Sequence, residues 1–169
     1  MQCLTDQETY RWLENKSIPI DPYSGNSPQK LYLQFKAPQT HRVIDSFARC
    51  YYLQILEKSD YLLHMTDWAH YQPSDMLTMT AIREKYGEKR RLIDAPGYLV
   101  DPKHTELSIS LFGLSVSFQW NCYLYSTKEQ TTLLNWEGEI FDFWTNCQNT
   151  KSIMLDIIQA FGLQELHKP

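Results

Sequence analysis

The sequence lacks the features that mark several common classes of protein. Mean hydropathy is -0.47 and 21% of the 169 residues are charged, which excludes a membrane-embedded protein and a disordered tail alike. Basic residues are not in excess, since 16 Lys and Arg face 20 Asp and Glu, and the net charge of -4 argues against nucleic acid or a membrane surface as partner. A chain of this length predicts one domain, residues 1–169, that folds without a disulfide or a structural metal.

The common catalytic and cofactor motifs are also missing. There is no GxGxxG, no P-loop, no HExxH and no EF-hand loop. The nearest approach to a nucleophile elbow, residues 113–117, lacks its second glycine and falls inside an apolar helix. We therefore predict no catalytic residue, no metal and no cofactor.

The cysteines and the N-terminus both point to a reducing compartment. The four cysteines form no CxxC pair and have no histidine at zinc-finger spacing: Cys3, Cys50, Cys122 and Cys147. The first residues contain no basic segment followed by an apolar core, so no secretion signal is visible. We expect reduced thiols in a cytoplasmic protein.

Hydrophobic periodicity and helix caps predict alternating helices and strands. The expected helices cover residues 6–16, 40–55, 75–86 and 101–118 and the tail after 149, and the expected strands cover 31–36, 61–68, 121–125 and 132–136. Residues 91–93 read as a short strand, and Ala95-Pro96-Gly97 as a type II turn. Residues 139–144 fit either a helix or a strand. The pattern predicts an α+β (or α/β) single-domain layered sandwich, with a mixed sheet, helices packed on it and a C-terminal helix.

The helix expected from residue 101 is apolar on every side and should be the most buried. We predict that its residues Leu111, Leu114 and Phe118 form the main hydrophobic contact with the strand residues Leu33, Phe35 and Leu63.

Two segments of opposite character compete as the surface for a partner. Residues 83–91 carry five basic and two acidic side chains, whereas residues 136–144 carry three acids among four large aromatic rings. Cations at a helix C-terminus complement its dipole, which accounts for the first segment as a solvated helix end. The second segment fits the core and rim of an edge element, but also a surface that selects a basic partner.

Aromatic residues supply most of the energy in protein interfaces, so we favour the acidic segment. The predicted partner-binding residues are Trp136, Glu137, Glu139 and Asp142, with Asp67 and Asp75 as an extension if the fold brings their loops together.

An enzyme is the alternative. Its polar site would be assembled from loops that follow strands, near Asp67, His70, Asp94 and Tyr98. A metal held by His64, Asp67, His70 and Asp75 is disfavoured, because residues three apart lie on opposite faces of a strand.

About a third of the chain carries a pattern of short motifs. The elements are Asp67-Trp68, Arg83 to Tyr86-Gly87, Ala95-Pro96-Gly97 and Phe118-Gln119-Trp120. In this pattern the chain resembles a group of uncharacterised bacterial proteins. A histidine commonly follows Ala-Pro-Gly in that group, where this chain has Tyr98. The resemblance implies a bacterial protein and no particular activity.

Size, modest acidity, richness in aromatic residues and the missing catalytic motifs together favour a protein-binding module. The form we expect is an immunity-type inhibitor that neutralises a toxin or another protein with a basic surface.

Overall fold

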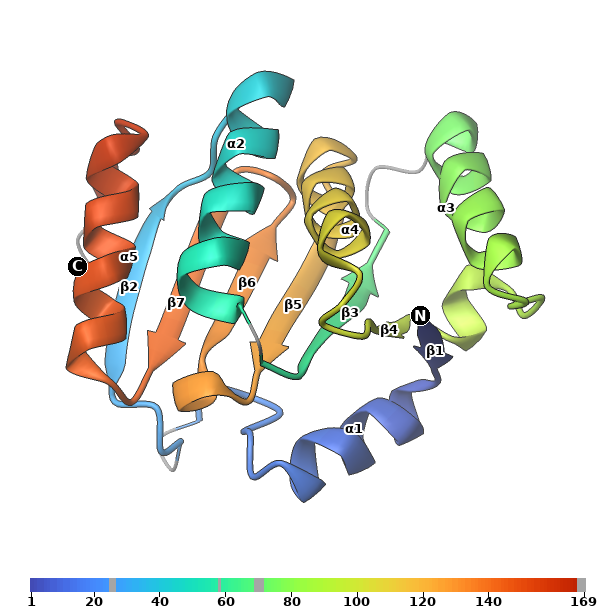
Figure 1. The fold of residues 1–169 in the computed structure, drawn as a ribbon, viewed down its shortest axis with the longest axis horizontal. Helices are drawn as coiled ribbons and strands as arrows, with labels where there is room; N and C mark the ends of the chain where they lie inside the picture. Colours follow the sequence, from blue (N-terminus) through green and yellow to red (C-terminus); the bar gives the residue numbers. More distant parts are fainter. Residues whose placement is uncertain (25–26, 58, 69–71, 167–169) are drawn as a thin grey trace.

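The computed structural model describes residues 1–24, 27–57, 59–68 and 72–166, and it confirms the α+β class. Its eight-stranded sheet has the order β1-β4-β3-β5-β6-β7-β2-β8 (Figure 1). The strands are β1 (Gln2–Leu4), β2 (Leu31–Lys36), β3 (Tyr61–Asp67), β4 (Gly97–Leu99), β5 (Asn121–Ser126), β6 (Thr132–Trp136), β7 (Ile140–Thr145) and β8 (Glu165–Leu166). The helices are α1 (Asp6–Asn15), α2 (His41–Tyr51), α3 (Pro73–Lys85), α4 (Thr105–Ser117) and α5 (Gln148–Ala160).

Every strand pairing among the described residues is antiparallel, so the expectation of a mixed sheet was wrong. Helices between strands suggested parallel crossover units. Instead, two successive hairpins reverse the chain from β5 through β6 to β7, and the helical connections also join antiparallel neighbours or distant strands.

One face of the sheet is covered by α2, α4 and α5, which form a single helical layer (Figure 1). Strand alternation directs Phe35 and Phe141 toward this layer, where both rings contact Phe47 of α2. Leu111 of α4 is buried in the same core, together with Leu33 and Leu63.

The predicted core is therefore confirmed for four of its six members, Leu33, Phe35, Leu63 and Leu111. Leu114 and Phe118 are only partly buried and pack against the margin of the core, because the buried side of α4 runs through Ile109, Phe112 and Val116.

The opposite face is covered in part by α1 and the segment that follows it. A capping box starts α1: the Thr5 hydroxyl accepts the Glu8 N–H at 3.2 Å, and the Glu8 carboxylate accepts the Thr5 N–H at 2.8 Å. Leu13 of α1 then packs on Leu62 and Tyr125 in a second, smaller core. This confirms the helix predicted over 6–16.

Several local predictions were wrong near α3. Pro73 rather than Asp75 opens this helix, with Gln72 as N-cap, and residues 92–94 form a 3₁₀ turn rather than a strand. Gly97 lies in β4 with no positive φ, so it is not the glycine of a type II turn. A Cβ at Gly97 would lie 2.4 Å from the Thr9 hydroxyl, which explains why glycine stands there.

Two further boundaries are settled. Residues 140–145 form a strand, the alternative left open by periodicity. The helix expected from Asp101 begins at Thr105, because Asp101 caps a preceding turn through a 2.9 Å bond from the Lys103 N–H. No helix within the described ranges is long and apolar enough to cross a membrane.

Candidate functional site

The face of the sheet away from α2, α4 and α5 carries exposed aromatic and apolar side chains. Four of the seven large apolar side chains that the described structure exposes lie on this side, and we call them the open-face patch: Tyr10, Ile20, Tyr23 and Trp136. Tyr10 packs edge-on against His64, and the carbonyl of Ile20 accepts a bond from Tyr125. Exposed apolar groups on the same side of a sheet are candidates for a binding surface.

Trp136 and Tyr23 form the centre of the patch. Trp136 ends β6 and is 42% exposed, while Tyr23 comes from the segment after α1 and is 46% exposed. The Tyr23 ring stands edge-on against the buried Trp144 of β7, with centroids 4.7 Å apart. The Trp136 indole N–H also lies 3.3 Å from the Tyr23 hydroxyl. The polar atoms of two exposed aromatic side chains thus meet at one point.

A buried carboxylate lies beneath these rings. Asp142 is 0% exposed and accepts hydrogen bonds from the Tyr23 hydroxyl at 2.5 Å, the Trp136 indole at 2.6 Å and the Gln34 amide at 2.9 Å. The Tyr32 hydroxyl donates to it as well. Four donors replace the water that a buried carboxylate would otherwise need.

The donors of this network do not ionise near neutral pH. Burial, followed by the hydrogen bond to Asp142, raises the pKa of Tyr23 and of Tyr32 well above the usual value for tyrosine. Both phenols therefore remain protonated donors. The network fixes the orientation of Trp136 and Tyr23, which lowers the entropy that a partner would lose in ordering them.

The tight turn between β6 and β7 places two carboxylates beside the patch. Glu137 and Gly138 both have positive φ, of 48° and 68°, and the Glu139 N–H returns to the Trp136 carbonyl at 2.8 Å. Trp136 pairs with Ile140, so three residues connect the strands, and the first two have the positive φ values of a type I′ turn. Asn121 fixes the turn by accepting the Glu137 N–H at 2.8 Å.

Asp67 lies at the same end of the sheet as this turn. Its partner across β3 and β5 is Asn121, the residue whose side chain holds Glu137. Asp75 is placed differently: it lies in the first turn of α3, and no contact among the described residues joins it to the hairpin. The fold thus brings Asp67 to the predicted surface and does not bring Asp75 there.

Asp142 also departs from its predicted role. As a fully buried acceptor it has no surface with which to contact a partner, so it acts as a positioning residue for Trp136. Trp144 is buried too. Alternation along β7 explains both results, because Phe141 and Phe143 face the helices and Asp142 and Trp144 lie under the segment after α1.

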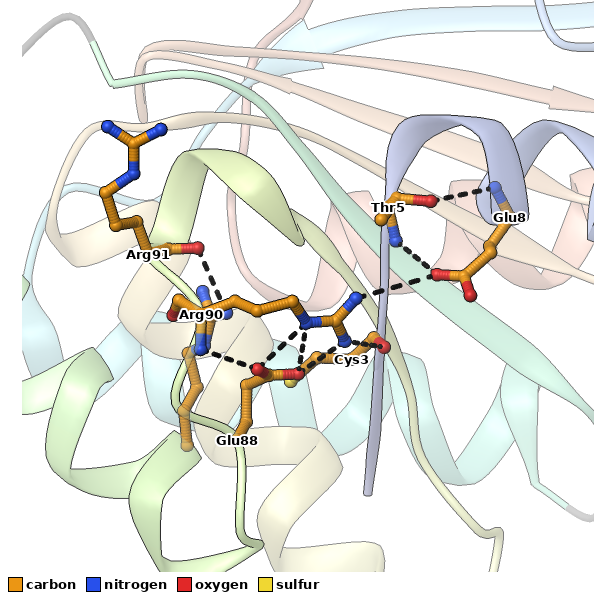
Figure 2. Close-up of polar contacts among 7 residues, drawn as sticks. Cys3, Thr5, Glu8, Glu88, Arg90 and Arg91 are labelled. Atoms are coloured by element: carbon orange, nitrogen blue, oxygen red, sulfur yellow. Dashed lines mark hydrogen bonds and ion pairs between the residues drawn. The ribbon is translucent and has the colours of Figure 1, made fainter.

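Two of the five basic side chains in segment 83–91, Arg90 and Arg91, form ion pairs within the chain. Figure 2 shows the Arg90 guanidinium between the carboxylates of Glu88 and Glu8, with a further bond of 2.9 Å to the Cys3 carbonyl. The hydrogen bonds from Arg90 lower the pKa of Glu88 to about 2. Arg91 pairs with Asp94 at 2.8 Å. These arginines are engaged in holding the loop and are poor candidates for a partner's contact.

The alternative enzyme site is not assembled by the described part of the structure. Tyr98 is buried toward the helical layer and contacts Arg83, and Asp94 is paired with Arg91. No described contact joins either residue to Asp67. His70 lies outside the described residues.

The described residues contain no group of three or more His, Cys, Asp or Glu side chains that could hold a metal. His64 is buried and contacts the Asp6 carboxylate at 2.7 Å. All four cysteines are free thiols, and burial raises the pKa of Cys122 to about 11, which makes it a poor nucleophile.

Three residues of the candidate site were not predicted. Tyr32 and Gln34 alternate with the core residues of β2, so the strand pattern alone placed them on the opposite face. Tyr23 lies in a loop with two prolines nearby, and nothing local in the sequence indicates that it folds back onto β7.

Compared with protein-family models, curated proteins and solved structures, the chain matches none. The function is therefore inferred from the chemistry of the site.

Proposed function

We propose that the chain is a protein-binding module whose open-face patch docks a protein with a basic surface. The observation that carries this proposal is the pair of exposed rings, Trp136 and Tyr23, held on a buried carboxylate. Rigid aromatic anchors surrounded by polar groups are the usual centre of a protein interface.

Charge supports a cationic partner. Glu137, Glu139 and Asp67 lie at the end of the sheet next to Trp136, whereas Arg90 and Arg91 of the basic segment are paired internally. Carboxylates at the rim steer a basic partner toward the aromatic centre and raise the rate of association.

An immunity-type inhibitor, which neutralises a toxin by masking its surface, is the specific form that we favour. The net charge of -4 and the carboxylates beside Trp136 suit the chain to cover a basic surface of such a toxin. Under this proposal, a stoichiometric amount of the chain abolishes the activity of its partner.

The test begins with co-purification from the native cell, followed by binding kinetics with the purified partner. Trp136→Ala should raise the dissociation rate about tenfold or more, as for a central aromatic anchor. Leu53→Ala is the matched control, because Leu53 is similarly exposed but lies on the helical side of the molecule.

Charge reversal provides the second arm of the test. Glu137→Lys with Glu139→Lys should slow association and weaken its salt dependence, whereas Glu57→Lys with Asp156→Lys changes the net charge equally at exposed positions elsewhere. Equal effects of the two double variants, together with equal effects of Trp136→Ala and Leu53→Ala, would exclude this face as the interface.

A further inference from the structure

A cavity of about 570 Å³ lies at the other end of the sheet, between α3 and residues 88–93. In Figure 1, α3 lies beyond β4, away from β6, the strand that ends at Trp136. The volume falls within the range of sites that bind small molecules. None of the residues proposed for the protein interface lines this cavity, although Trp68 on its wall directly follows Asp67 in the chain.

The walls of the cavity are mainly apolar. The apolar surface comes from Trp68, Met76, Leu92 and Ile93, and polar and charged side chains of α3 and residues 88–91 complete the lining. The Trp68 ring rests edge-on against the buried Trp120, with centroids 4.8 Å apart, so this wall is firmly supported. Ile93 is 65% exposed, so part of its apolar surface lies open at the mouth of the cavity.

A buried cation also lines the cavity. Arg83 is 1% exposed, and its guanidinium donates to the carbonyls of Arg90 and Arg91 at 3.2 and 3.3 Å and to the Tyr98 hydroxyl at 3.4 Å. All three acceptors are neutral and all three bonds are long. Figure 2 shows the carbonyl of Arg91 turned into this contact while its side chain points away.

The charge of Arg83 is not balanced by an ion pair with any described carboxylate. Glu88 and Asp94 both lie near enough for the charge of Arg83 to lower the pKa of their carboxyl groups, but the Glu88 oxygens are hydrogen-bonded by Arg90. Asp94 is likewise engaged by Arg91. Burying a guanidinium without a counter-ion is costly, because the solvation that it loses is not replaced by a direct charge partner.

We propose that this cavity binds a small carboxylic acid with an apolar body, whose carboxylate pairs with Arg83 and whose body lies against Trp68 and Ile93. A planar carboxylate matches the fork of a guanidinium, and the pairing supplies the missing counter-ion. Arg90 and Arg91 also line the cavity, but they are already paired with Glu88 and Asp94, which leaves Arg83 as the guanidinium that lacks a carboxylate partner among the described residues.

The experiment uses the whole chain and four probes: octanoate, phenylpropionate, octanol and octylamine. Calorimetric titration and backbone amide chemical shifts are recorded for each. We expect both carboxylates to bind saturably at one site, about tenfold or more tighter than octanol, because a charge-assisted pair replaces a neutral contact. Octylamine should bind more weakly still.

Three variants locate the site. Arg83→Gln should remove the preference for carboxylate over alcohol. Thr80→Trp should block the binding of both octanoate and octanol, because the larger side chain fills the cavity. Thr80 is chosen because it makes no described hydrogen bond to the Arg83 guanidinium. Leu77→Ala, on the exposed side of α3, should bind as the unaltered chain does.

If Arg83→Gln fails to fold, Thr80→Trp and the comparison of octanoate with octanol still decide the matter. Absence of saturable carboxylate binding, equal affinity for octanoate and octanol, or unchanged binding in Thr80→Trp would each overturn the proposal. None of these outcomes depends on Trp136 or on a protein partner.

Discussion

The indole nitrogen of Trp136 donates a 2.6 Å hydrogen bond to the carboxylate of Asp142, so an exposed ring at the end of β6 is tied to a buried anion in the middle of β7. Tyr23 is tied to the same carboxylate from a distant segment of the chain. The shape of the open-face patch therefore depends on a residue that no partner touches. Stability and binding are coupled at this one position.

Asp142→Asn should destabilise the fold and weaken partner binding together. The amide keeps the size of the side chain but replaces one charged acceptor with a donor, which faces the N–H and O–H groups now bonded to Asp142. Loss of charge-assisted bonds in a buried site predicts a cost of about 1.5–3 kcal/mol in the free energy of unfolding by urea. Glu139→Gln, at an exposed carboxylate, should change stability by less than about 0.5 kcal/mol.

Leu111→Ala should cost about 2–5 kcal/mol, because it leaves a cavity where α4 meets the sheet. Leu77→Ala is the control, since its side chain is exposed on α3, and it should lie within about 0.5 kcal/mol of the unaltered chain. Equal unfolding midpoints for the two variants would show that α4 does not form the centre of the core.

The sequence predicts elements well where one local signal is sufficient. The capping box of Thr5 and Glu8 predicts the start of α1. The alternation of Leu31, Leu33 and Phe35 with polar residues predicts β2. Short edge strands are missed, because a segment of three residues such as Gln2–Leu4 is too short to show a two-residue hydrophobic alternation. Their pairing with Gly97–Leu99 is decided by tertiary contacts alone.

The candidate site was predictable only in part, for a related physical reason. The rings and acids of residues 136–144 indicate an unusual surface, but which of them is exposed depends on what covers the other side of β7. Tyr23 provides that cover and buries Asp142 from more than a hundred residues away. The burial of Arg83 is hidden in the same way, because the two residues that follow it, Glu84 and Lys85, are exposed and charged.

Two glycines with positive φ provide a matched pair for testing the β6–β7 turn. In Gly87→Ala the new Cβ has no atom within 4 Å. The free energy of unfolding should therefore fall only by the strain of a left-handed backbone, about 1–2 kcal/mol. In Gly138→Ala the new Cβ would lie 2.6 Å from the Val116 carbonyl, so the backbone must also shift. We expect Gly138→Ala to lower the melting temperature clearly more than Gly87→Ala. The opposite order would mean that the turn does not pack against the end of α4.

His64 should make the protein less stable as the pH falls below neutrality. Burial lowers the pKa of His64, and the hydrogen bond to Asp6 opposes this shift only in part. The unfolded chain takes up a proton near pH 6.5, whereas the folded chain resists it until a lower pH. Stability is therefore complete above about pH 6.5 and decreases as the pH falls through that value.

The stability contributed by Glu88 is lost in a lower pH range than the stability contributed by His64, so the two effects can be measured separately. Its pKa in the folded protein is about 2, so the stability that it contributes is present above its usual value of 4.5 and is lost only as the pH falls from there toward 2. Urea unfolding between pH 8 and 5 thus reports His64 without Glu88. The free energy of unfolding of His64→Gln should change less with pH in this window, whatever its value at pH 8. In the unaltered chain, the pKa of His64 followed by its ring protons should lie below that of an exposed histidine. An unchanged slope in the variant would show that another group controls this window.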